Sequence, residues 1–370
     1  MFNRTKTDRP TIAVTGSAGK TTAKVMIAAI LRTKWVVFET KDYWNTTEHT
    51  QKHKDMILPI HRAAVLEYGM AYPGVIRKHC QIIQPNFAVI TNIGMAHVGN
   101  FDGDIKGVAK AKSEIIHGMK QDGHLFLNKD DQNSNLLETK TFKGKIVTVG
   151  IDCEADYQAI RVDYVEKGME FTINLHGKDC RFFIPVFGKH NVYNALFAIA
   201  IADLLGFSSR EMYKGLEQIK ITSRRLVMNH LKDGITVIDD TVHAHPAAMK
   251  AALEVLSSVG KNRNIVVFGR MPELGEQMIT AHREIGTFIA AQKVDWLFTY
   301  GNNADEYGIG AEEAGFPSNR IVHYPNYTRE EFHKELIKHI EPGTTILIKG
   351  ASRLNMFDTV KYLKEYYQDE

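Results

Sequence analysis

The sequence has few cysteines, no long apolar run and no excess of either charge. Its three cysteines, Cys80, Cys153 and Cys180, form no CxxC pair, which argues against a zinc ribbon and a disulfide framework, so we expect reduced thiols. No apolar stretch approaches the roughly 18 residues that a membrane span needs, and the first residues are polar and charged. We therefore expect a cytoplasmic protein with no membrane partner.

Charge and length narrow the interpretation further. The chain has 46 Lys and Arg against 43 Asp and Glu, a formal net charge of +3. Such a weak excess does not favour a nucleic-acid partner. A chain of 370 residues is long for one hydrophobic core, so two domains are expected.

Strand and helix patterns alternate in the first half of the chain. Residues 11–15 (TIAVT) read as a buried strand, and Lys20 to Leu31 is apolar at helical spacing. Further strands are predicted at 63–67, 87–91 and 124–127. This alternation is typical of an α/β fold with a mostly parallel sheet. Period-two alternation from 156 to 187, broken by KG and HGKD turns, predicts a small antiparallel sheet, and a helix over 191–205 follows it.

The second half repeats the strand and helix alternation. Its strands are predicted at 236–238, 265–268, 296–300 and 345–348. They indicate a second α/β domain, with a boundary near Ile221. The predicted domains are thus 1–221 and 222–370.

The strongest chemical signal is TGSAGKTT, Thr15 to Thr22, between a predicted strand and a predicted helix. Glycines there let backbone N–H groups face phosphate oxygens, Lys20 would contact the β- and γ-phosphates, and the Thr21 hydroxyl would bind Mg²⁺. The alternative is a glycine turn with a surface lysine. The residues expected to bind the nucleotide here are Gly16, Ser17, Ala18, Gly19, Lys20, Thr21 and Thr22.

The spacing GxxGKT is two residues shorter than the general phosphate loop, and it resembles the TGTxGKT loop of the Mur ligases. Later segments resemble that family in the same order, most closely its MurF branch, which adds D-alanyl-D-alanine to a UDP-linked peptide. They are VLEYGMAYPG (65–74), TNIGMAHVGNF (91–101), GVAKAKSEI (107–115), FGKHNVYNAL (187–196), SRRL (223–226), VIDDTVHAHP (237–246), FGRMPELGE (268–276) and LIKGASR (347–353).

The resemblance implies a central ATP-binding domain followed by a Rossmann-like C-terminal domain. It implies Mg²⁺ ligands at Glu67 and His97, and a carbamylated lysine at Lys112 that binds a second Mg²⁺. Taken singly, Glu67 reads as a solvated strand end, His97 as a loop histidine, and the KAK run 110–112 as an exposed helix face. Their joint position behind a phosphate loop favours the metal site.

The resemblance also assigns nucleotide contacts. His190, Asn191 and Asn194 would hold the base, Asp240 the ribose, and Arg225 the phosphates after domain closure. The implied activity uses ATP to turn a carboxylate into an acyl phosphate, which an amine then attacks. The partners would be a small-molecule or peptide carboxylate and an amino acid or dipeptide.

Charge offers independent support for this activity. Phosphoryl transfer to a carboxylate brings two anions together, and Lys20, Arg225 and Mg²⁺ would offset their repulsion. The expected catalytic residues are Lys20, His97, Lys112 and Arg225. The alternatives are a nucleotide-binding partner protein that has lost ligase activity, and a phosphate-loop kinase or ATPase, which leaves the second domain unexplained.

Several positions depart from the MurF pattern. The phosphate loop begins within twenty residues of the first residue, where the family has a UDP-gripping domain, so we expect a substrate that is not UDP-linked. VHAHP (242–246) replaces YNANP, Arg270 replaces an acid, and NTTEH (45–49) replaces an Asn-rich substrate loop. We expect Arg270 to face an acidic group. After the last strand, the segment with Lys349, Ser352 and Arg353 reads either as a substrate contact or as a basic loop.

Overall fold

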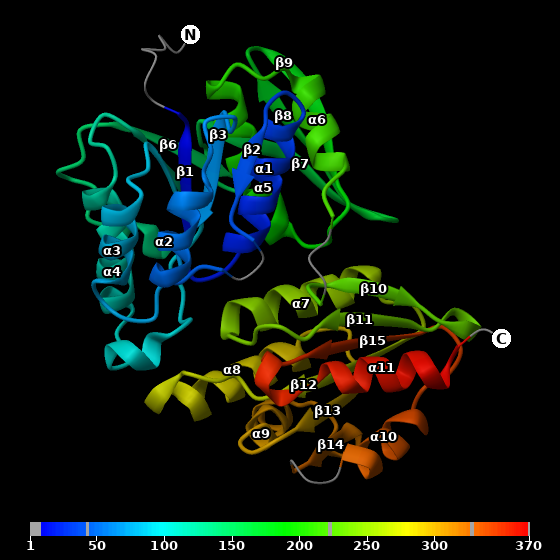
Figure 1. Ribbon diagram of the computed structural model, residues 1–370. Helices are drawn as coiled ribbons and strands as arrows, with labels where there is room; N and C mark the ends of the chain where they lie inside the picture. Colours follow the sequence, from blue (N-terminus) through cyan, green and yellow to red (C-terminus); the bar gives the residue numbers. More distant parts are fainter. Residues whose placement is uncertain (1–8, 42–43, 221–223, 326–328, 369–370) are drawn as a thin grey trace. The chain divides into compact units, whose positions relative to one another are not determined.

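The computed structural model describes residues 9–41, 44–220, 224–325 and 329–368 (Figure 1). The chain divides into two compact units, Met1–Lys220 and Ile221–Glu370. Each unit is described by itself. The predicted boundary at Ile221 and the first residue of the SRRL segment, Ser223, lie outside the described residues.

The first unit is built on a nine-stranded sheet in the order β2-β3-β1-β4-β5-β6-β7-β8-β9. The first six strands pair in parallel, and the last three form an antiparallel meander. The strands are β1 (Thr11–Thr15), β2 (Val37–Glu39), β3 (Ala63–Glu67), β4 (Phe87–Ile90), β5 (His124–Asn128), β6 (Lys145–Gly150), β7 (Tyr157–Val165), β8 (Gly168–Leu175) and β9 (Lys178–Ile184).

This architecture confirms the predicted α/β class with a parallel sheet and an antiparallel extension. The antiparallel strands are continuous with the parallel sheet, because β6 and β7 pair in parallel at Val149–Tyr157 and Gly150–Gln158. The sequence reading missed β2 and β6. The first has only three residues, and the second begins with two exposed residues, Lys145 and Ile146, so neither shows a long apolar run.

Helices cover the sheet of the first unit. Figure 1 shows α3 and α4 together to one side and α1, α5 and α6 to the other, in agreement with the contacts α3–α4, α1–α5 and α1–α6. The helices are α1 (Lys20–Arg32), α2 (Thr47–Met56), α3 (Val75–Ile82), α4 (Ile105–Gly118), α5 (Lys189–Leu204) and α6 (Ser209–Glu217), with 3-10 turns η1 (Val98–Phe101) and η2 (Gln132–Leu136). Helix α5 is apolar on nearly every side, as expected for a helix buried in a core.

The parallel strands of the first unit determine where its chemistry gathers. Strands β1, β3 and β4 are buried, which suits their continuous apolar runs. Val14 is in register with Glu67, and Thr15 with Ile90. The carboxyl ends of the three strands therefore meet at one edge of the sheet, where open α/β sheets bind their ligands.

An aspartate ties the start of α5 to this sheet. Asp130, just after β5, accepts hydrogen bonds from the backbone N–H groups of Ile151, Asp152 and Cys153 and from the hydroxyl of Tyr193 in α5. Burial raises the pKa of Asp130, but these hydrogen bonds outweigh it and bring the pKa down to about 2. Asp130 is thus held as an anion that joins three elements.

The second unit contains a six-stranded sheet in the order β10-β11-β15-β12-β13-β14, parallel except for the edge strand β10. Its strands are β10 (Val227–His230), β11 (Thr236–Asp240), β12 (Arg263–Gly269), β13 (Trp296–Tyr300), β14 (Ile321–Tyr324) and β15 (Thr344–Lys349). Its helices are α7 (Pro246–Val259), α8 (Met278–Ala290), α9 (Asp305–Glu313), α10 (Arg329–Ile337) and α11 (Phe357–Tyr366), with turns η3 (Lys232–Gly234), η4 (Gly275–Gln277), η5 (Ser318–Arg320) and η6 (Ser352–Leu354). This open, mostly parallel sheet with helices is the predicted second α/β domain.

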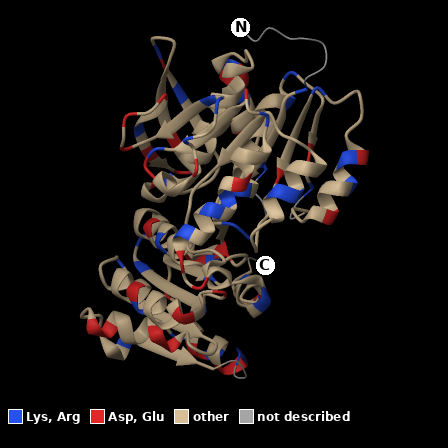
Figure 2. Cartoon of the chain, turned by 90° about the vertical axis from the view of Figure 1, so that its left-hand side faces the viewer, with Lys and Arg blue, Asp and Glu red and all other residues tan. Residues whose placement is uncertain are grey.

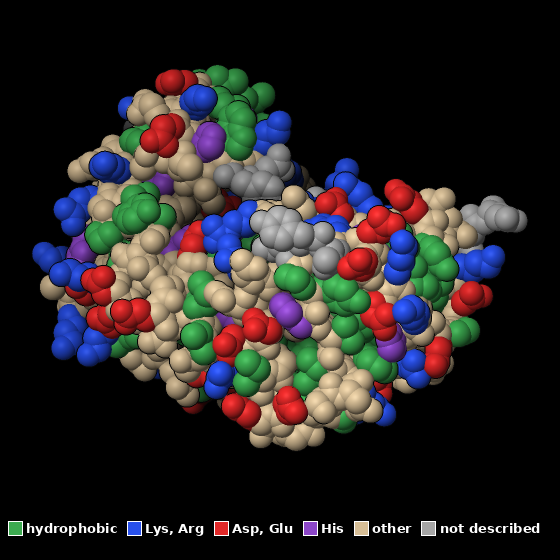
Figure 3. Space-filling model, turned by 90° about the horizontal axis from the view of Figure 1, so that it is seen from below, with side chains coloured by type: hydrophobic (Ala, Val, Ile, Leu, Met, Phe, Trp, Pro, Cys, Tyr) green, Lys and Arg blue, Asp and Glu red, His purple; other side chains and the backbone are tan. Residues whose placement is uncertain are grey.

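Charged side chains of both signs are scattered over both units (Figure 2). The face drawn in Figure 3 also mixes Lys and Arg with Asp and Glu. In these views, neither the basic nor the acidic side chains form one large patch of a single sign. Within the described ranges, every helix is too short or too polar to span a membrane.

Candidate active site

Two glycines shape the loop between β1 and α1. Gly16 and Gly19 have φ angles of 147° and 80°, in the region that favours glycine. A Cβ atom at Gly16 would lie 1.9 Å from Oγ1 of Thr91, and one at Gly19 would lie 2.7 Å from Oδ1 of Asn194. The loop is thus packed closely between the end of β4 and helix α5, with no room for a side chain at either glycine.

Hydrogen bonds from the segment after β4 hold the same loop in place. The backbone N–H groups of Ser17 and Ala18 donate to the backbone and side-chain oxygens of Asn92, at 3.0 Å each. The hydroxyl of Ser17 also exchanges hydrogen bonds with the backbone of Gly94. The loop is therefore a fixed part of the sheet edge, as a preorganised phosphate site needs to be.

Lys20 opens helix α1 directly behind the loop. Its Nζ donates to the carbonyl of Gly16 at 2.9 Å, so the ammonium group lies over the loop. Thr21 is buried in the first turn, and Thr22 is partly exposed beside it. A glycine-rich turn, an ammonium group and a helix N-terminus are the groups expected in a site for polyphosphate, so the binding role of this loop stays a prediction that the geometry fits.

Glu67, the last residue of β3, is buried, with 2% of its side chain exposed. Its Oε1 accepts a hydrogen bond from Nδ2 of Asn45 at 2.9 Å. Its Oε2 is also buried but has no hydrogen-bond partner in the described part of the chain. Buried carboxylate oxygens rarely lack a partner, and Mg²⁺ takes such oxygens as ligands. The site therefore fits a magnesium ion, and Glu67 is not a solvated strand end.

His97 lies on the segment that follows β4. Its backbone is left-handed, with φ 64°, which is uncommon outside glycine, and it stands directly before η1. Among the described residues, no three or more His, Cys, Asp and Glu side chains form a cluster that could hold a metal ion. An ion at Glu67 would therefore need further oxygens from hydroxyl groups, phosphate or water, the usual ligands of Mg²⁺.

Lys112 is buried in helix α4, whereas Lys110 is exposed. The exposed-face alternative for the KAK run thus holds for Lys110 and fails for Lys112. Burial, and to a smaller extent the charge of nearby Lys20, lowers the pKa of Lys112 well below its ordinary value. A neutral amine is the form that reacts with carbon dioxide, so the chemistry of Lys112 fits the predicted carbamate.

The expected base contacts lie in the first turns of α5. Asn194 packs against Gly19 of the phosphate loop. Its Nδ2 donates to Oδ1 of Asn191 at 3.1 Å, and Asn191 in turn donates to the carbonyl of Phe187. The ring of His190 lies close to the backbone of Gly188. The structure thus brings Asn194 to the loop directly and Asn191 through Asn194.

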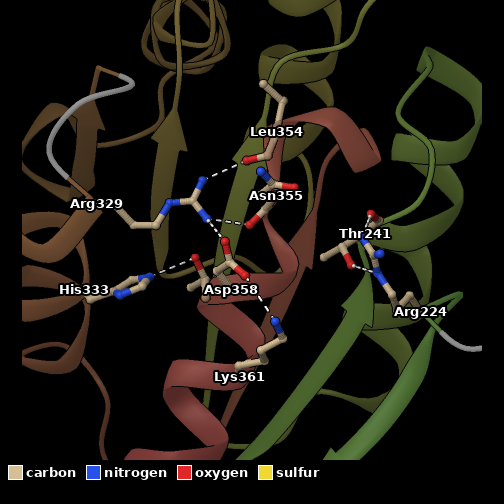
Figure 4. Close-up of polar contacts among 9 residues, drawn as sticks. Arg224, Thr241, Arg329, His333, Leu354, Asn355, Asp358 and Lys361 are labelled. Atoms are coloured by element: carbon tan, nitrogen blue, oxygen red, sulfur yellow. Dashed lines mark hydrogen bonds and ion pairs between the residues drawn. The ribbon is translucent and has the colours of Figure 1, made fainter.

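Arg225 and Asp240 belong to the second unit. Arg224, just before Arg225, donates to the side-chain and backbone oxygens of Thr241, which anchors the start of this unit (Figure 4). Asp240 ends β11 and accepts a hydrogen bond from Nζ of Lys349 at 2.6 Å. The predicted roles of Arg225 and Asp240 toward the nucleotide stay predictions.

The other second-unit residues named in the sequence analysis are Lys349, Ser352, Arg353 and Arg270. Lys349 is buried and donates also to the carbonyl of His243 at 2.8 Å. Ser352 donates through its side chain to the carbonyl of Val242, while Arg353 is exposed. Lys349 and Ser352 therefore brace the VHAHP segment. Arg270 is half-buried, and its Nε has no hydrogen-bond partner within the described ranges.

Two residues of the site escaped the sequence reading. Asn45 donates a hydrogen bond to Glu67, although the resemblance placed its segment, NTTEH, at a substrate loop. Lys24, one turn after Lys20 in α1, is buried with its Nζ 3.8 Å from carboxylate oxygens of both Glu39 and Glu67. The sequence could have indicated the burial of Lys24, because this residue lies among the apolar residues that form the buried face of α1.

The chain also matches known families and proteins. Residues 14–202 match the Mur ligase middle domain, and residues 224–352 match the Mur ligase glutamate ligase domain. The chain belongs to the Mur ligase family. A UDP-N-acetylmuramoyl-tripeptide–D-alanyl-D-alanine ligase of Bacillus subtilis is 36% identical to it over 96% of this chain and 76% of that protein. The enzyme of the same name from Haemophilus influenzae is 31% identical over 81% of this chain and 66% of its own length.

Solved structures agree with this membership. MurF from Acinetobacter baumannii superposes with a TM-score of 0.87 at 29% identity, covering 96% of this chain and 76% of that one. MurF from Thermotoga maritima in complex with ADP has a TM-score of 0.83 at 22% identity and covers 96% and 79%, which shows the shared fold.

The comparisons confirm several predictions and go against one. Mur ligases are ATP-dependent ligases that use Mg²⁺, so the predicted enzyme class and cofactors are confirmed. The altered partner protein is not favoured. The comparisons go against the expectation of a substrate that is not UDP-linked, because relatives matching almost the whole chain are named for a UDP-linked substrate. That expectation rested on where the sequence begins, which does not bear on what these two domains join.

Proposed function

We propose that this Mur ligase is a MurF-type enzyme. It would use ATP to activate the terminal carboxylate of a UDP-linked muramoyl peptide and join it to D-alanyl-D-alanine. The observation that carries this proposal is the 36% identity, over 96% of the chain, to a ligase named for that reaction. The phosphate loop and the buried Glu67 and Lys112 support it, because these groups suit the binding of ATP and its magnesium ions.

In this proposal, the first unit binds the triphosphate. Backbone N–H groups of the loop other than those of Ser17 and Ala18, which donate to Asn92, would face the phosphates, and Lys20 would move its ammonium group from the carbonyl of Gly16 to the β- and γ-phosphates. Thr21, Glu67, His97 and the carbamate of Lys112 are the residues that would hold magnesium. Bound Mg²⁺ neutralises charge on the phosphates during transfer.

The remaining predicted contacts belong to the same proposal. His190 and Asn191 would approach the base, with Asn194 bracing the loop. From the second unit, Asp240 would bind the ribose and Arg225 the phosphates. Asp240 can bind a ribose hydroxyl with the oxygen that Lys349 leaves free, since a carboxylate accepts several hydrogen bonds.

The reaction balances without another reagent. A carboxylate oxygen of the peptide attacks the γ-phosphorus, and ADP leaves with the electrons of the broken P–O bond. The amine of the dipeptide then attacks the acyl carbon, loses a proton, and expels inorganic phosphate. Lys20 and Arg225 would offset negative charge in the first step, where two anions meet.

We propose that two departures from the MurF pattern affect how the nucleotide and the substrate are bound. Val242, His243 and His245 replace an aromatic and two amides, so we propose that ATP binds with altered base contacts. We also propose that Arg270 faces a carboxylate of the substrate or a phosphate, because its Nε lacks a partner within the described residues. Arg270→Asp should raise the KM of the dipeptide at least tenfold, or lower turnover; unchanged values would exclude this role.

A phosphate-release assay tests the proposed function. With ATP, Mg²⁺, UDP-N-acetylmuramoyl-tripeptide and D-alanyl-D-alanine, we expect phosphate release and a UDP-linked pentapeptide by mass spectrometry. Omitting either the tripeptide or the dipeptide should stop release. Phosphate release without a carboxylate substrate would indicate an ATPase. Release only with a different carboxylate and amine would show that the two proposed substrates are wrong. A cytoplasmic location completes the proposal, because ATP is supplied there.

A further inference from the structure

The carboxylate of Glu67 is held firmly on one oxygen. Nδ2 of Asn45 donates to Oε1 at 2.9 Å. Asn45 is itself held, because its carbonyl accepts a hydrogen bond from the backbone N–H of Gly69 at 2.9 Å. A Cβ atom at Gly69 would lie 2.7 Å from that carbonyl oxygen. The segment of Asn45 is therefore packed against the chain just after β3, which leaves its amide little freedom to turn.

The other oxygen is supported by charge instead of a hydrogen bond. Nζ of Lys24 lies 3.8 Å from Oε2, beyond hydrogen-bonding distance, and donates to the carbonyl of Thr40 at 2.8 Å. The hydroxyl of Thr40 accepts a hydrogen bond from the backbone N–H of Glu67. Lys24 therefore offsets the buried negative charge while Oε2 keeps its lone pairs.

We propose that Asn45 is a positioning residue for the magnesium ion. By holding Oε1, it turns Oε2 of Glu67 toward the ion, and Lys24 stabilises the carboxylate in that orientation. The inference rests on the proposed role of Glu67 as a metal ligand. Asn45 directly precedes Thr46, the N-cap of α2, so the orientation of this ligand is tied to the NTTEH segment.

Divalent-metal binding tests the inference without the reaction. We would titrate Mn²⁺ into the full chain with ADP and follow free Mn²⁺ by electron paramagnetic resonance. Asn45→Ala should raise the Mn²⁺ dissociation constant about tenfold or more, the usual cost of losing a hydrogen bond that orients a ligand. The affinity for ADP without divalent ions should stay unchanged. Asn45→Ser, whose side chain ends one bond short of the amide nitrogen, serves if Asn45→Ala does not fold.

A matched control and a ligand variant separate the outcomes. Asn174→Ala removes another amide that donates to a carboxylate, Oδ1 of Asp179 at 2.8 Å on the exposed β8–β9 turn, and should leave Mn²⁺ binding unchanged. Glu67→Gln should weaken Mn²⁺ binding at least as much as Asn45→Ala. If Glu67→Gln weakens binding and Asn45→Ala does not, the positioning role is wrong while the metal site stands. If neither variant changes binding, the proposed site at Glu67 is wrong as well.

Discussion

Lys349 of the second unit and Lys112 of the first unit are both buried, but their surroundings act on the charge in opposite ways. In the second unit, Lys349 donates to Asp240 at 2.6 Å and to the carbonyl of His243. In the first unit, the pKa of Lys112 is lowered well below its ordinary value by burial and by Lys20. A buried cation with an acidic partner is a structural brace, whereas a buried amine beside another cation is a reactive group.

The comparison separates the parts of the molecule that hold it together from those that do chemistry. Figure 4 shows a cluster of the second unit whose polar groups have partners: Arg329 donates to the carbonyls of Leu354 and Asn355 and pairs with Asp358. In the first unit, Oε2 of Glu67 has no hydrogen-bond partner among the described residues. Such an imbalance is typical of a site whose remaining partners are ligands.

The largest expected effect concerns activity. Lys112→Met should lower turnover in the phosphate-release assay on the order of 10²-fold or more, because it removes an anion-forming group from the metal site. In buffer with ¹³C-bicarbonate, the wild-type chain should show a carbamate signal by nuclear magnetic resonance that Lys112→Met lacks. Lys349→Met should keep that signal. If the carbamate signal persists in Lys112→Met, another residue is carbamylated.

The next effect concerns stability. Lys349→Met should destabilise the second unit by about 3–5 kcal/mol, because it leaves the carboxylate of Asp240 largely buried without its cation. Urea unfolding measures this, and the double variant Lys349→Met, Asp240→Asn should recover most of the loss. A loss below about 1 kcal/mol, the usual value of a surface pair, would show that the pair is not a brace.

The same substitution at the other lysine should have a smaller effect. In bicarbonate-free buffer, Lys112→Met replaces a buried amine with an apolar side chain of similar length, so the first unit should keep or gain stability. Thermal unfolding beside that of the wild-type chain measures it. A loss equal to that of Lys349→Met would remove the contrast between the two lysines.

The smallest effects depend on pH. The folded-state pKa of Asp130 is about 2, below its ordinary 3.8, so its stabilisation is present above 3.8 and disappears as pH falls through about 2. Burial raises the pKa of Asp239 in the second unit, so its contribution is present at low pH and is lost as pH rises. Asp130→Asn should therefore destabilise the chain at pH 7, and Asp239→Asn should not. Urea unfolding at pH 7 and pH 4 checks the sign for Asp239, and unfolding at pH 4 and about pH 2 checks the sign for Asp130.

The sequence predicted those elements that carry their own local signal. The bounds of β1, β3 and β13 follow from uninterrupted apolar runs, and α1 from helical spacing after a glycine turn. The edge strand β2 has only three residues and β6 begins with two exposed residues, so neither has such a signal, and their neighbours in the sheet decide their structure.

Contacts between residues that are far apart in the sequence could not be predicted from local patterns. Lys349 and Asp240 are 109 residues apart, and Asn45 and Glu67 are 22 apart, so neither pair forms a local pattern. Only the fold shows that Lys112 is buried while Lys110 in the same KAK run is exposed. The family resemblance named Glu67, His97 and Lys112, but the surroundings that tune these groups come from packing.

Isotope transfer tests the central claim, carboxylate activation by ATP, most directly. The peptide substrate would carry ¹⁸O in its terminal carboxylate, and the released phosphate would be analysed by mass spectrometry after one turnover. An acyl phosphate retains one carboxylate oxygen on phosphorus when the amine attacks the acyl carbon, so we predict one ¹⁸O in the phosphate for each amide formed. Amide formation with unlabelled phosphate would contradict the account.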